Sequence, residues 1–197
     1  MFVRALVKLF GGFWKLKERC NQTPSKFLRK HLIGLYRAYQ IPYGSSIAWN
    51  SHFEGPPCLP HGLYGIFVAA TSKIGKNCVM FHQVTVGANT LPDSKGVGAP
   101  IIGDNCYIGA GAKIVGKVRV GNNVRVAANG VVYQNVPDNA VVVSGEQRVI
   151  RREKELNNKF HVYDRGTWRY FDDGRWVEEY DPAVIKVLEF CIKAYDT

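Results

Sequence analysis

Five histidines are the side chains in this sequence best suited to move protons near neutral pH: His31, His52, His61, His82 and His161. A neutral imidazole can take the proton from a hydroxyl group as its oxygen attacks an electrophile, which makes an alcohol an effective nucleophile. Neutral imidazoles are also good zinc ligands. His61 lies in the segment HGLYGIF, and His82 follows 21 residues later in FHQVTVG. What this pair can do depends on the elements that hold it.

A six-residue repeat runs through the middle of the chain and predicts its architecture. An aliphatic residue recurs at every sixth position, and the residue after it is usually small. A period of six fits neither a helix nor an alternating strand, whereas one short strand and one sharp corner per hexad explain it. The aliphatic residues then point into a core, and the small residues let neighbouring coils approach. These aliphatic positions are Val68, Ile74, Met80, Val86, Ile102, Ile108, Ile114, Val120, Val126 and Val132.

The repeat is interrupted once, between Val86 and Ile102. The segment NTLPDSKGVGAP contains two prolines and two glycines, which is typical of a loop. We therefore predict that residues 89–100 form a loop that leaves the repeat structure and returns to it. A tolerated surface insertion is the alternative to a functional loop.

The stretch IGDNCYIGAGAKIVGKVRVGNNVRVAANGVVYQNVPDNAVV, with HGLYGIF and KIGKNCVMFHQVTVG, resembles the hexapeptide-repeat acyltransferases. The resemblance covers roughly residues 44–150 and points to the serine acetyltransferases and the related saccharide O-acetyltransferases. It implies an all-β core folded as a left-handed parallel β-helix, with three hexads in each coil. It also implies a homotrimer, acetyl-CoA as co-substrate, no metal, and an active site between subunits to which the loop contributes.

The resemblance also implies roles for particular residues. His61 matches the general base that deprotonates the acceptor hydroxyl. His82 follows after about one 18-residue coil plus a short bulge, so we expect it on the same face, orienting the acceptor or the thioester. Small corner residues match those along which the pantetheine arm lies, and three further positions match the nucleotide end, where an arginine can pair with a phosphate. These cofactor positions are Ala110 and Ala128, then Tyr133, Gln134 and Arg148.

The sequence departs from the family pattern at three places. Ser46 stands where the family has an aspartate that orients the base, and Glu54 or His52 is a candidate substitute. Residues 144–147 read SGEQ where the family has Gly-x-Pro-Ala before the arginine. The long helical N-terminal domain of serine acetyltransferases has no match here. From the hexads, the placement of the histidines and the lack of a match to that domain, we expect a saccharide hydroxyl as acceptor, in polysaccharide or glycan-precursor modification. Serine O-acetylation, a non-catalytic assembly module and zinc chemistry are the alternatives.

Most of the net charge of +10 is carried by the N-terminal segment. Residues 1–40 contain nine Lys or Arg and one acid, which leaves a nearly neutral body. We predict a basic helical arm over residues 1–43, with two helices separated by residues 21–25 and a cap at Thr23-Pro24. This arm either covers the open end of the β-helix or contacts an anionic membrane surface through residues 1–20. No nucleic-acid-binding motif occurs, so no nucleic acid is expected as partner.

The composition and the C-terminal segment complete the prediction. At 46% apolar and 21% charged, the chain has a soluble globular composition, and five scattered cysteines suit a reducing compartment. With no signal peptide recognised, we expect a cytoplasmic protein, placed at the inner face of the membrane if the arm binds there. Residues 151–197 form the predicted extension. It contains a hairpin turning at Asp173-Gly174 and a helix capped by Asp181-Pro182.

Overall fold

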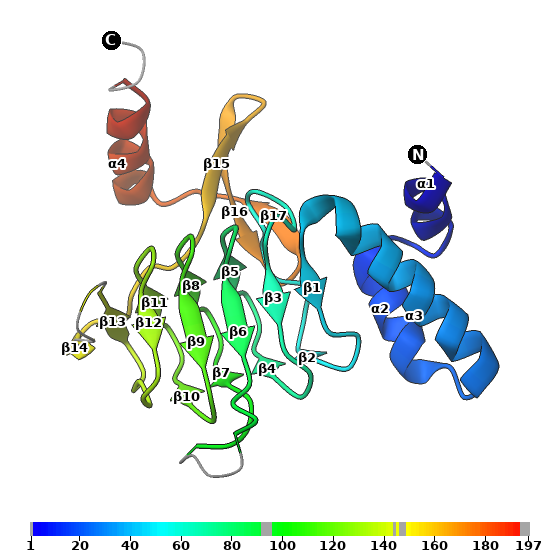
Figure 1. Ribbon diagram of the computed structural model, residues 1–197. Coiled ribbons are helices and arrows are strands. Elements are labelled where there is room, and N and C mark those ends of the chain that lie inside the picture. The colour runs from blue at the N-terminus through cyan, green and yellow to red at the C-terminus, as the bar shows by residue number, and fades with distance from the viewer. Residues whose placement is uncertain (1, 92–95, 144, 146–148, 194–197) are drawn as a thin grey trace.

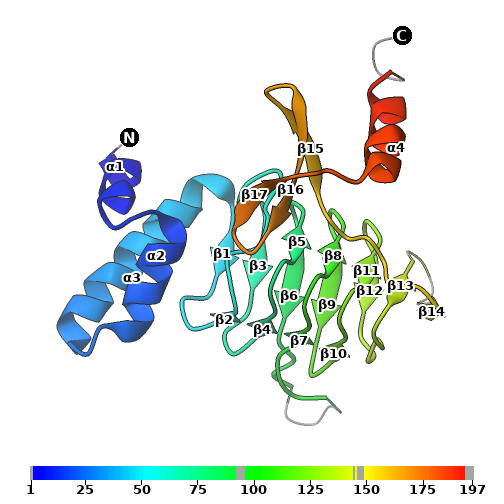
Figure 2. The same cartoon turned by 180° about the vertical axis from the view of Figure 1, so that it is seen from behind.

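The computed structural model describes residues 2–91, 96–143, 145 and 149–193. Its centre is a three-sided parallel β-helix, which confirms the architecture that the six-residue repeat predicts (Figure 1). Three helices lie at the N-terminal end of the β-helix (Figure 1). An antiparallel sheet and a helix from the C-terminal segment lie along its side, as the opposite view also shows (Figure 2).

Each side of the β-helix is a sheet of short strands from successive coils. Strands in neighbouring coils pair in parallel, so that Val68 faces Val86 and Ile108 faces Val126, 18 residues apart in each case. Sheet A contains β1 (Ser46–Ile47), β3 (Phe67–Val68), β6 (Thr85–Gly87), β9 (Lys113–Val115) and β12 (Val131–Val132). Sheet B contains β2 (His52–Phe53), β4 (Lys73–Ile74), β7 (Ile101–Ile102) and β10 (Arg119–Val120). Sheet C contains β5 (Val79–Met80), β8 (Tyr107–Ile108), β11 (Arg125–Val126) and β13 (Ala140–Val142), and β14 (Val149–Arg151) joins its edge antiparallel to β13.

The predicted aliphatic positions form the core. All ten of them are 2% exposed or less. After seven of the ten aliphatic positions the corner follows a rule that our sequence analysis did not include: the third residue after the aliphatic one adopts a left-handed conformation. Asparagine and glycine tolerate that conformation best, and they predominate at this position. The residues concerned are Thr71, Asn77, Gln83, Asn105, Gly111, Asn123 and Asn129.

Close stacking explains the glycine that follows the aliphatic residue in many hexads. A Cβ placed on Gly103 would lie 2.8 Å from the carbonyl carbon of Gly121 in the next coil. The amide of Gly103 donates to the carbonyl of Val120 over 2.9 Å, so the two backbones cannot separate without losing sheet hydrogen bonds. Small residues at this position are therefore a condition for coil stacking.

The N-terminal segment contains three α-helices where we predicted two: α1 (Phe2–Leu9), α2 (Phe13–Gln22) and α3 (Lys26–Gln40). The additional break falls at Gly11 and Gly12, which both have positive φ angles. The predicted cap is also wrong by two residues. Ser25 caps α3, where its Oγ accepts from the amide of Leu28, while Thr23 ends α2. A short 3-10 helix, η1 (Ile41–Tyr43), then leads into the first coil.

These helices cover the open end of the β-helix. The inward faces of α2 and α3 join the core of the first coil, with Leu16 and Tyr36 almost fully buried. The Trp14 ring lies 5.0 Å from that of Phe53, centroid to centroid. The Gln40 side-chain oxygen accepts from the amide of Ile47 over 2.6 Å. The capping interpretation therefore agrees with the structure. None of the described helices is long and apolar enough to cross a membrane.

The C-terminal segment covers the outer surface of sheet C. Asn158 donates to the carbonyl of Asn105, and the Phe160 ring meets that of Phe81. Both local predictions are confirmed: Asp173 and its glycine form the hairpin turn, and Asp181 caps the final helix through the amide of Ala183. The predicted two-stranded hairpin is extended by one further antiparallel strand, which precedes it in the chain. The elements are β15 (His161–Asp164), β16 (Thr167–Asp172), β17 (Arg175–Glu178) and α4 (Pro182–Lys193).

Replacing Gly103 with alanine tests the close stacking of coils. The added methyl must push two coil backbones apart, so we expect the free energy of unfolding in urea to fall by about 1–3 kcal/mol. Gly34→Ala is the matched control, because a Cβ there meets no atom within 4 Å and lies in helix α3. That variant should gain up to about 1 kcal/mol. Equal effects of the two substitutions would contradict the stacking argument.

Candidate active site

The corner between sheets C and A carries both candidate catalytic histidines. In each coil the chain leaves sheet C, turns and enters sheet A, through residues 59–66, 81–84, 109–112 and 127–130 in successive coils. We call this column of turns the C–A corner. His61 lies in its first turn and His82 in its second. Two histidines far apart in the sequence are therefore placed in adjacent coils on one edge of the β-helix.

A three-residue bulge aligns the two rings. Cys58 pairs with Val79, 21 residues later, whereas Val68 pairs with Val86, 18 residues later. The additional residues therefore lie in the first turn, where His61 is, as the spacing of the histidines predicts. The ring centroids of His61 and His82 are 4.9 Å apart, and their Nδ1 atoms are 2.8 Å apart. His61 is exposed, while His82 is half-buried.

Main-chain hydrogen bonds hold the turn that carries His82. The carbonyl of His82 accepts from the amide of Gly111 over 3.0 Å, and the amide of Gln83 donates to the carbonyl of Tyr64 over 2.9 Å. The Lys113 ammonium group donates to the carbonyl of Gln83 over 2.7 Å. The turn is therefore tied to the coil on each side of it, which gives His82 a firmly positioned backbone.

Phe81 supports the exposed histidine, and our sequence analysis missed it. Its ring meets the His61 ring edge to face, with 5.5 Å between centroids and 90° between planes. It also contacts the rings of Tyr107 and Phe160. The position of Phe81 directly before His82 was a sequence signal for a role at the site. The contact of Phe81 with the C-terminal segment, however, depends on tertiary packing. Through Phe81, the C-terminal extension supports the position of His61.

The predicted cofactor residues fall into three groups. Ala110 and Ala128 lie in the third and fourth turns of the C–A corner, where the amide of Asn129 donates to the carbonyl of Ala110. They therefore continue the column that carries the histidines. Tyr133 and Gln134 are exposed but follow β12, so one chain places them at the opposite edge of sheet A. Arg148 lies outside the described residues.

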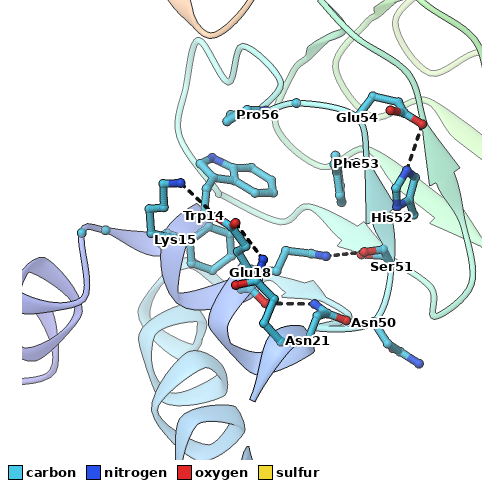
Figure 3. Close-up of a pocket in the computed structure, with 16 residues that line it drawn as sticks. Trp14, Lys15, Glu18, Asn21, Asn50, Ser51, His52, Phe53, Glu54 and Pro56 are labelled. Carbon is cyan, nitrogen blue, oxygen red and sulfur yellow. Dashed lines mark hydrogen bonds and ion pairs between the residues drawn. The ribbon is translucent and has the colours of Figure 1, made fainter. Parts of the chain in front are cut away.

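The candidates for orienting His61 are placed elsewhere. His52 and Glu54 pair with each other, with 2.9 Å between Nε2 and Oε1, whereas the Nδ1 atom of His61 meets that of His82. His52 and Glu54 line a cavity of about 850 Å³ between α2 and the first coil, with Trp14 and Phe53 beside them (Figure 3). His61 and His82 are not among the described residues that line this cavity. Across the described part of the chain, no three His, Cys, Asp or Glu side chains gather where they could hold a metal ion.

Lys17 is the unexpected feature of that cavity. Its side chain is buried and donates to the carbonyls of Trp49, over 3.1 Å, and Ser51. Burial lowers the pKa of Lys17 to about 8, because removal from water destabilises the charged amine; the nearby Cys20 opposes this shift. The sequence contained a signal for this burial, since Lys17 shares the spacing of Phe13, Leu16 and Cys20, which form the inward face of α2.

Comparison with known proteins finds similarity to transferases. The bacterial transferase hexapeptide (six repeats) family matches residues 99–134. A serine acetyltransferase of Synechococcus elongatus is 30% identical over 149 residues, covering 76% of this chain and 57% of that protein. A serine acetyltransferase of Mycobacterium tuberculosis is 37% identical over 86 residues, covering 44% of this chain and 37% of that protein. The chain thus spans between a third and three fifths of the length of these relatives.

Solved structures show the same fold. The crystal structure of Neisseria gonorrhoeae serine acetyltransferase superposes with a TM-score of 0.60 at 26% identity, covering 73% of this chain and 52% of that one. A soybean serine acetyltransferase complexed with serine gives a TM-score of 0.60 at 27% identity, with coverages of 70% and 54%. The fold is therefore the left-handed parallel β-helix that the resemblance implies.

These comparisons correct the predicted acceptor. We expected a saccharide hydroxyl, in polysaccharide biosynthesis, but the relatives and neighbours found are named serine acetyltransferases. The prediction relied on the hexads, on the placement of the histidines and on the lack of a match to the long helical N-terminal domain. None of these features reports on the acceptor directly, because acceptor choice depends on the side chains that surround the reacting hydroxyl.

The lowered pKa of Lys17 predicts how stability responds to alkaline pH. Between pH 8 and the ordinary lysine pKa near 10.4, the unfolded chain binds more protons at this site than the folded chain does. Folding stability should therefore rise with pH in this window, by on the order of 2 kcal/mol from Lys17 alone. Urea unfolding of the native protein and of Lys17→Met, at pH 7.5 and pH 10, measures the difference. Equal pH slopes for the two proteins would show that Lys17 has an ordinary pKa.

Proposed function

Because this chain belongs to the hexapeptide-repeat acyltransferases, we propose that it transfers an acetyl group from acetyl-CoA to the hydroxyl of L-serine. The observation that carries the proposal is the exposed His61 imidazole, held against His82 on the C–A corner. The serine acetyltransferase relatives support serine as the acceptor. His61 is the general base of the proposed reaction.

The chemistry needs a base because a serine hydroxyl is a poor nucleophile while it keeps its proton. His61 takes that proton as the oxygen attacks the thioester carbonyl carbon, and it then returns a proton to the departing thiolate. Its exposure allows a small acceptor to reach the ring, and Phe81 holds the ring plane. Proton transfer of this kind contributes on the order of 10²–10⁴-fold to a rate.

We assign the acetyl-CoA co-substrate to the C–A corner beyond His82. Ala110 and Ala128 have short side chains and lie in successive coils of the same column, which suits the close approach of an extended pantetheine arm. Tyr133, Gln134 and Arg148 remain the proposed contacts at the nucleotide end. Because Tyr133 and Gln134 follow sheet A instead of preceding it, one chain does not bring them to the histidine pair.

A homotrimer would resolve that separation, and we propose one. A groove between two prisms can combine the C–A corner of one subunit with the far edge of sheet A of its neighbour. The outer surface of sheet A offers apolar area for such packing, since Phe67 is 47% and Val131 is 40% exposed. The loop at residues 89–100 leaves between β6 and β7, at the far edge of sheet A, where it can contribute to the shared site.

Substitution of His61 tests the proposed function. His61→Ala should reduce thiol release from acetyl-CoA in the presence of L-serine by about 10²–10⁴-fold, because the acceptor loses its base. Acetyl-CoA binding by calorimetry should persist at one site per subunit, and sedimentation should still give three times the chain mass. His31→Ala is the matched control, because His31 is exposed on α3. Near-native turnover by His61→Ala, or binding of acetyl-CoA without serine turnover by the native protein, would refute the assignment.

We also propose that α1 contacts anionic membrane surfaces while α2 and α3 cap the β-helix. Phe2 is 76% and Leu9 is 81% exposed, and Arg4 and Lys8 lie on the same short helix. Basic groups beside exposed apolar side chains suit a headgroup region rich in negative charge. Of residues 1–20, α2 belongs to the cap, whereas α1 buries Val7 against the core but leaves Phe2 and Leu9 exposed, so α1 is the part that can contact a membrane.

Point substitutions in α1 test membrane contact without removing the cap. We expect the double variant Phe2→Ser, Leu9→Ser to bind vesicles containing phosphatidylserine at least about tenfold more weakly than the native chain, because two apolar anchors are lost. Phe27→Ser is the control, since Phe27 is equally exposed but lies on α3. Co-sedimentation with vesicles measures the binding. Unchanged binding by the double variant would exclude α1 as the contact.

A further inference from the structure

We propose that His82 is the positioning residue for His61, accepting a hydrogen bond from the Nδ1–H of His61 through its own Nδ1. This inference rests on the proposed function, because it explains how the base of that reaction is oriented. It assigns to an imidazole the role that an aspartate has in the family pattern, since Ser46 stands at the matching position and Glu54 pairs with His52 instead.

The contact between the two rings restricts where their protons can be. A neutral imidazole carries one proton, on either Nδ1 or Nε2. With 2.8 Å between the two Nδ1 atoms, one of them donates and the other accepts. One ring then has its proton on Nδ1 and a free lone pair on Nε2. The other ring has the reverse arrangement, with its proton on Nε2.

Exposure and anchoring decide which ring is the base. His61 is exposed, so a lone pair on its Nε2 can meet an acceptor hydroxyl. His82 is half-buried, and its turn is tied to both adjacent coils by the amide of Gly111 and the carbonyl of Tyr64. A fixed hydrogen-bond acceptor and a solvent-facing donor are the arrangement that a base and its positioning partner need. His61 therefore carries the Nδ1 proton.

The proton inventory is consistent through the reaction. Serine gives its hydroxyl proton to Nε2 of His61, while the new C–O bond forms and the carbonyl π pair moves to oxygen. The His61 ring is then a cation whose Nδ1–H still donates to His82, and a charged donor strengthens that hydrogen bond. The electron pair on that oxygen then re-forms the carbonyl, the C–S bond breaks with its pair on sulfur, and the proton on Nε2 passes to the thiolate. His82 neither gains nor loses a proton.

Two substitutions at His82 distinguish its two nitrogen atoms. Asparagine places an amide oxygen near the position of Nδ1, whereas glutamine reaches the position of Nε2. We expect His82→Asn to keep kcat within about tenfold of the native value, and His82→Gln and His82→Leu to lose on the order of 10²-fold, with the KM for serine little changed. His31→Asn is the matched control, because His31 contacts a carbonyl of its own helix. Retained activity in His82→Gln together with loss in His82→Asn would overturn the proposal, since His82 would then act through Nε2 on a substrate.

Nitrogen NMR of the histidine-labelled protein tests the same idea without any substrate. The shifts should show His61 with its proton on Nδ1 in the native protein, and a change of that tautomer in His82→Leu. A proton on Nε2 of His61 in the native protein would overturn the proposal. Because this measurement needs no turnover, it tests the positioning role of His82 separately from the proposed acetylation of serine. If the tautomer is as expected but serine is not acetylated, the histidine pair stands and the proposed function fails.

Discussion

The distance between neighbouring coils governs the rest of this structure. Parallel strands lie about 4.7–4.9 Å apart, so every residue repeats its position one strand spacing away in the next coil. The two histidine rings are 4.9 Å apart, centroid to centroid, because they occupy equivalent turns in adjacent coils. The same spacing forbids a side chain on Gly103 and places Ala110 and Ala128 in line with the histidines. The core and the candidate site therefore share one geometric origin.

A β-helix must also protect its two ends and any face that would otherwise remain open. The N-terminal helices close the first coil with an apolar face, and they bury Lys17 where its amine meets main-chain carbonyls. The C-terminal extension covers sheet C and holds its own fold with a buried pair, His161 and Glu179, 2.9 Å apart. Although burial opposes the shift, hydrogen bonds from His161 and the amide of Asp181 lower the pKa of Glu179.

The covering segments and the candidate site are connected. Phe160 of the extension meets Phe81, and Phe81 meets the His61 ring. Changes in the C-terminal segment can thus reach the base without any contact with substrate. The acceptor is decided differently. One β-helix with one histidine base is compatible with several hydroxyl acceptors, which is why the lack of a match to the long helical domain misled the prediction of a saccharide.

The sequence by itself determined the β-helix, because a six-residue period leaves no other regular structure in which every aliphatic residue is buried. It also predicted that His61 and His82 share one face, since their spacing equals one coil plus three residues, and it predicted the turn at Asp173 and the cap at Asp181. Only the tertiary structure decided which atoms of the two rings meet, that His52 pairs with Glu54, and that Lys17 is buried. Two adjacent glycines indicate the break between α1 and α2, but we did not predict it. A sequence repeat predicts the contacts that recur between neighbouring coils. These other contacts depend on side-chain packing that the repeat does not describe, so their geometry could not be predicted from it.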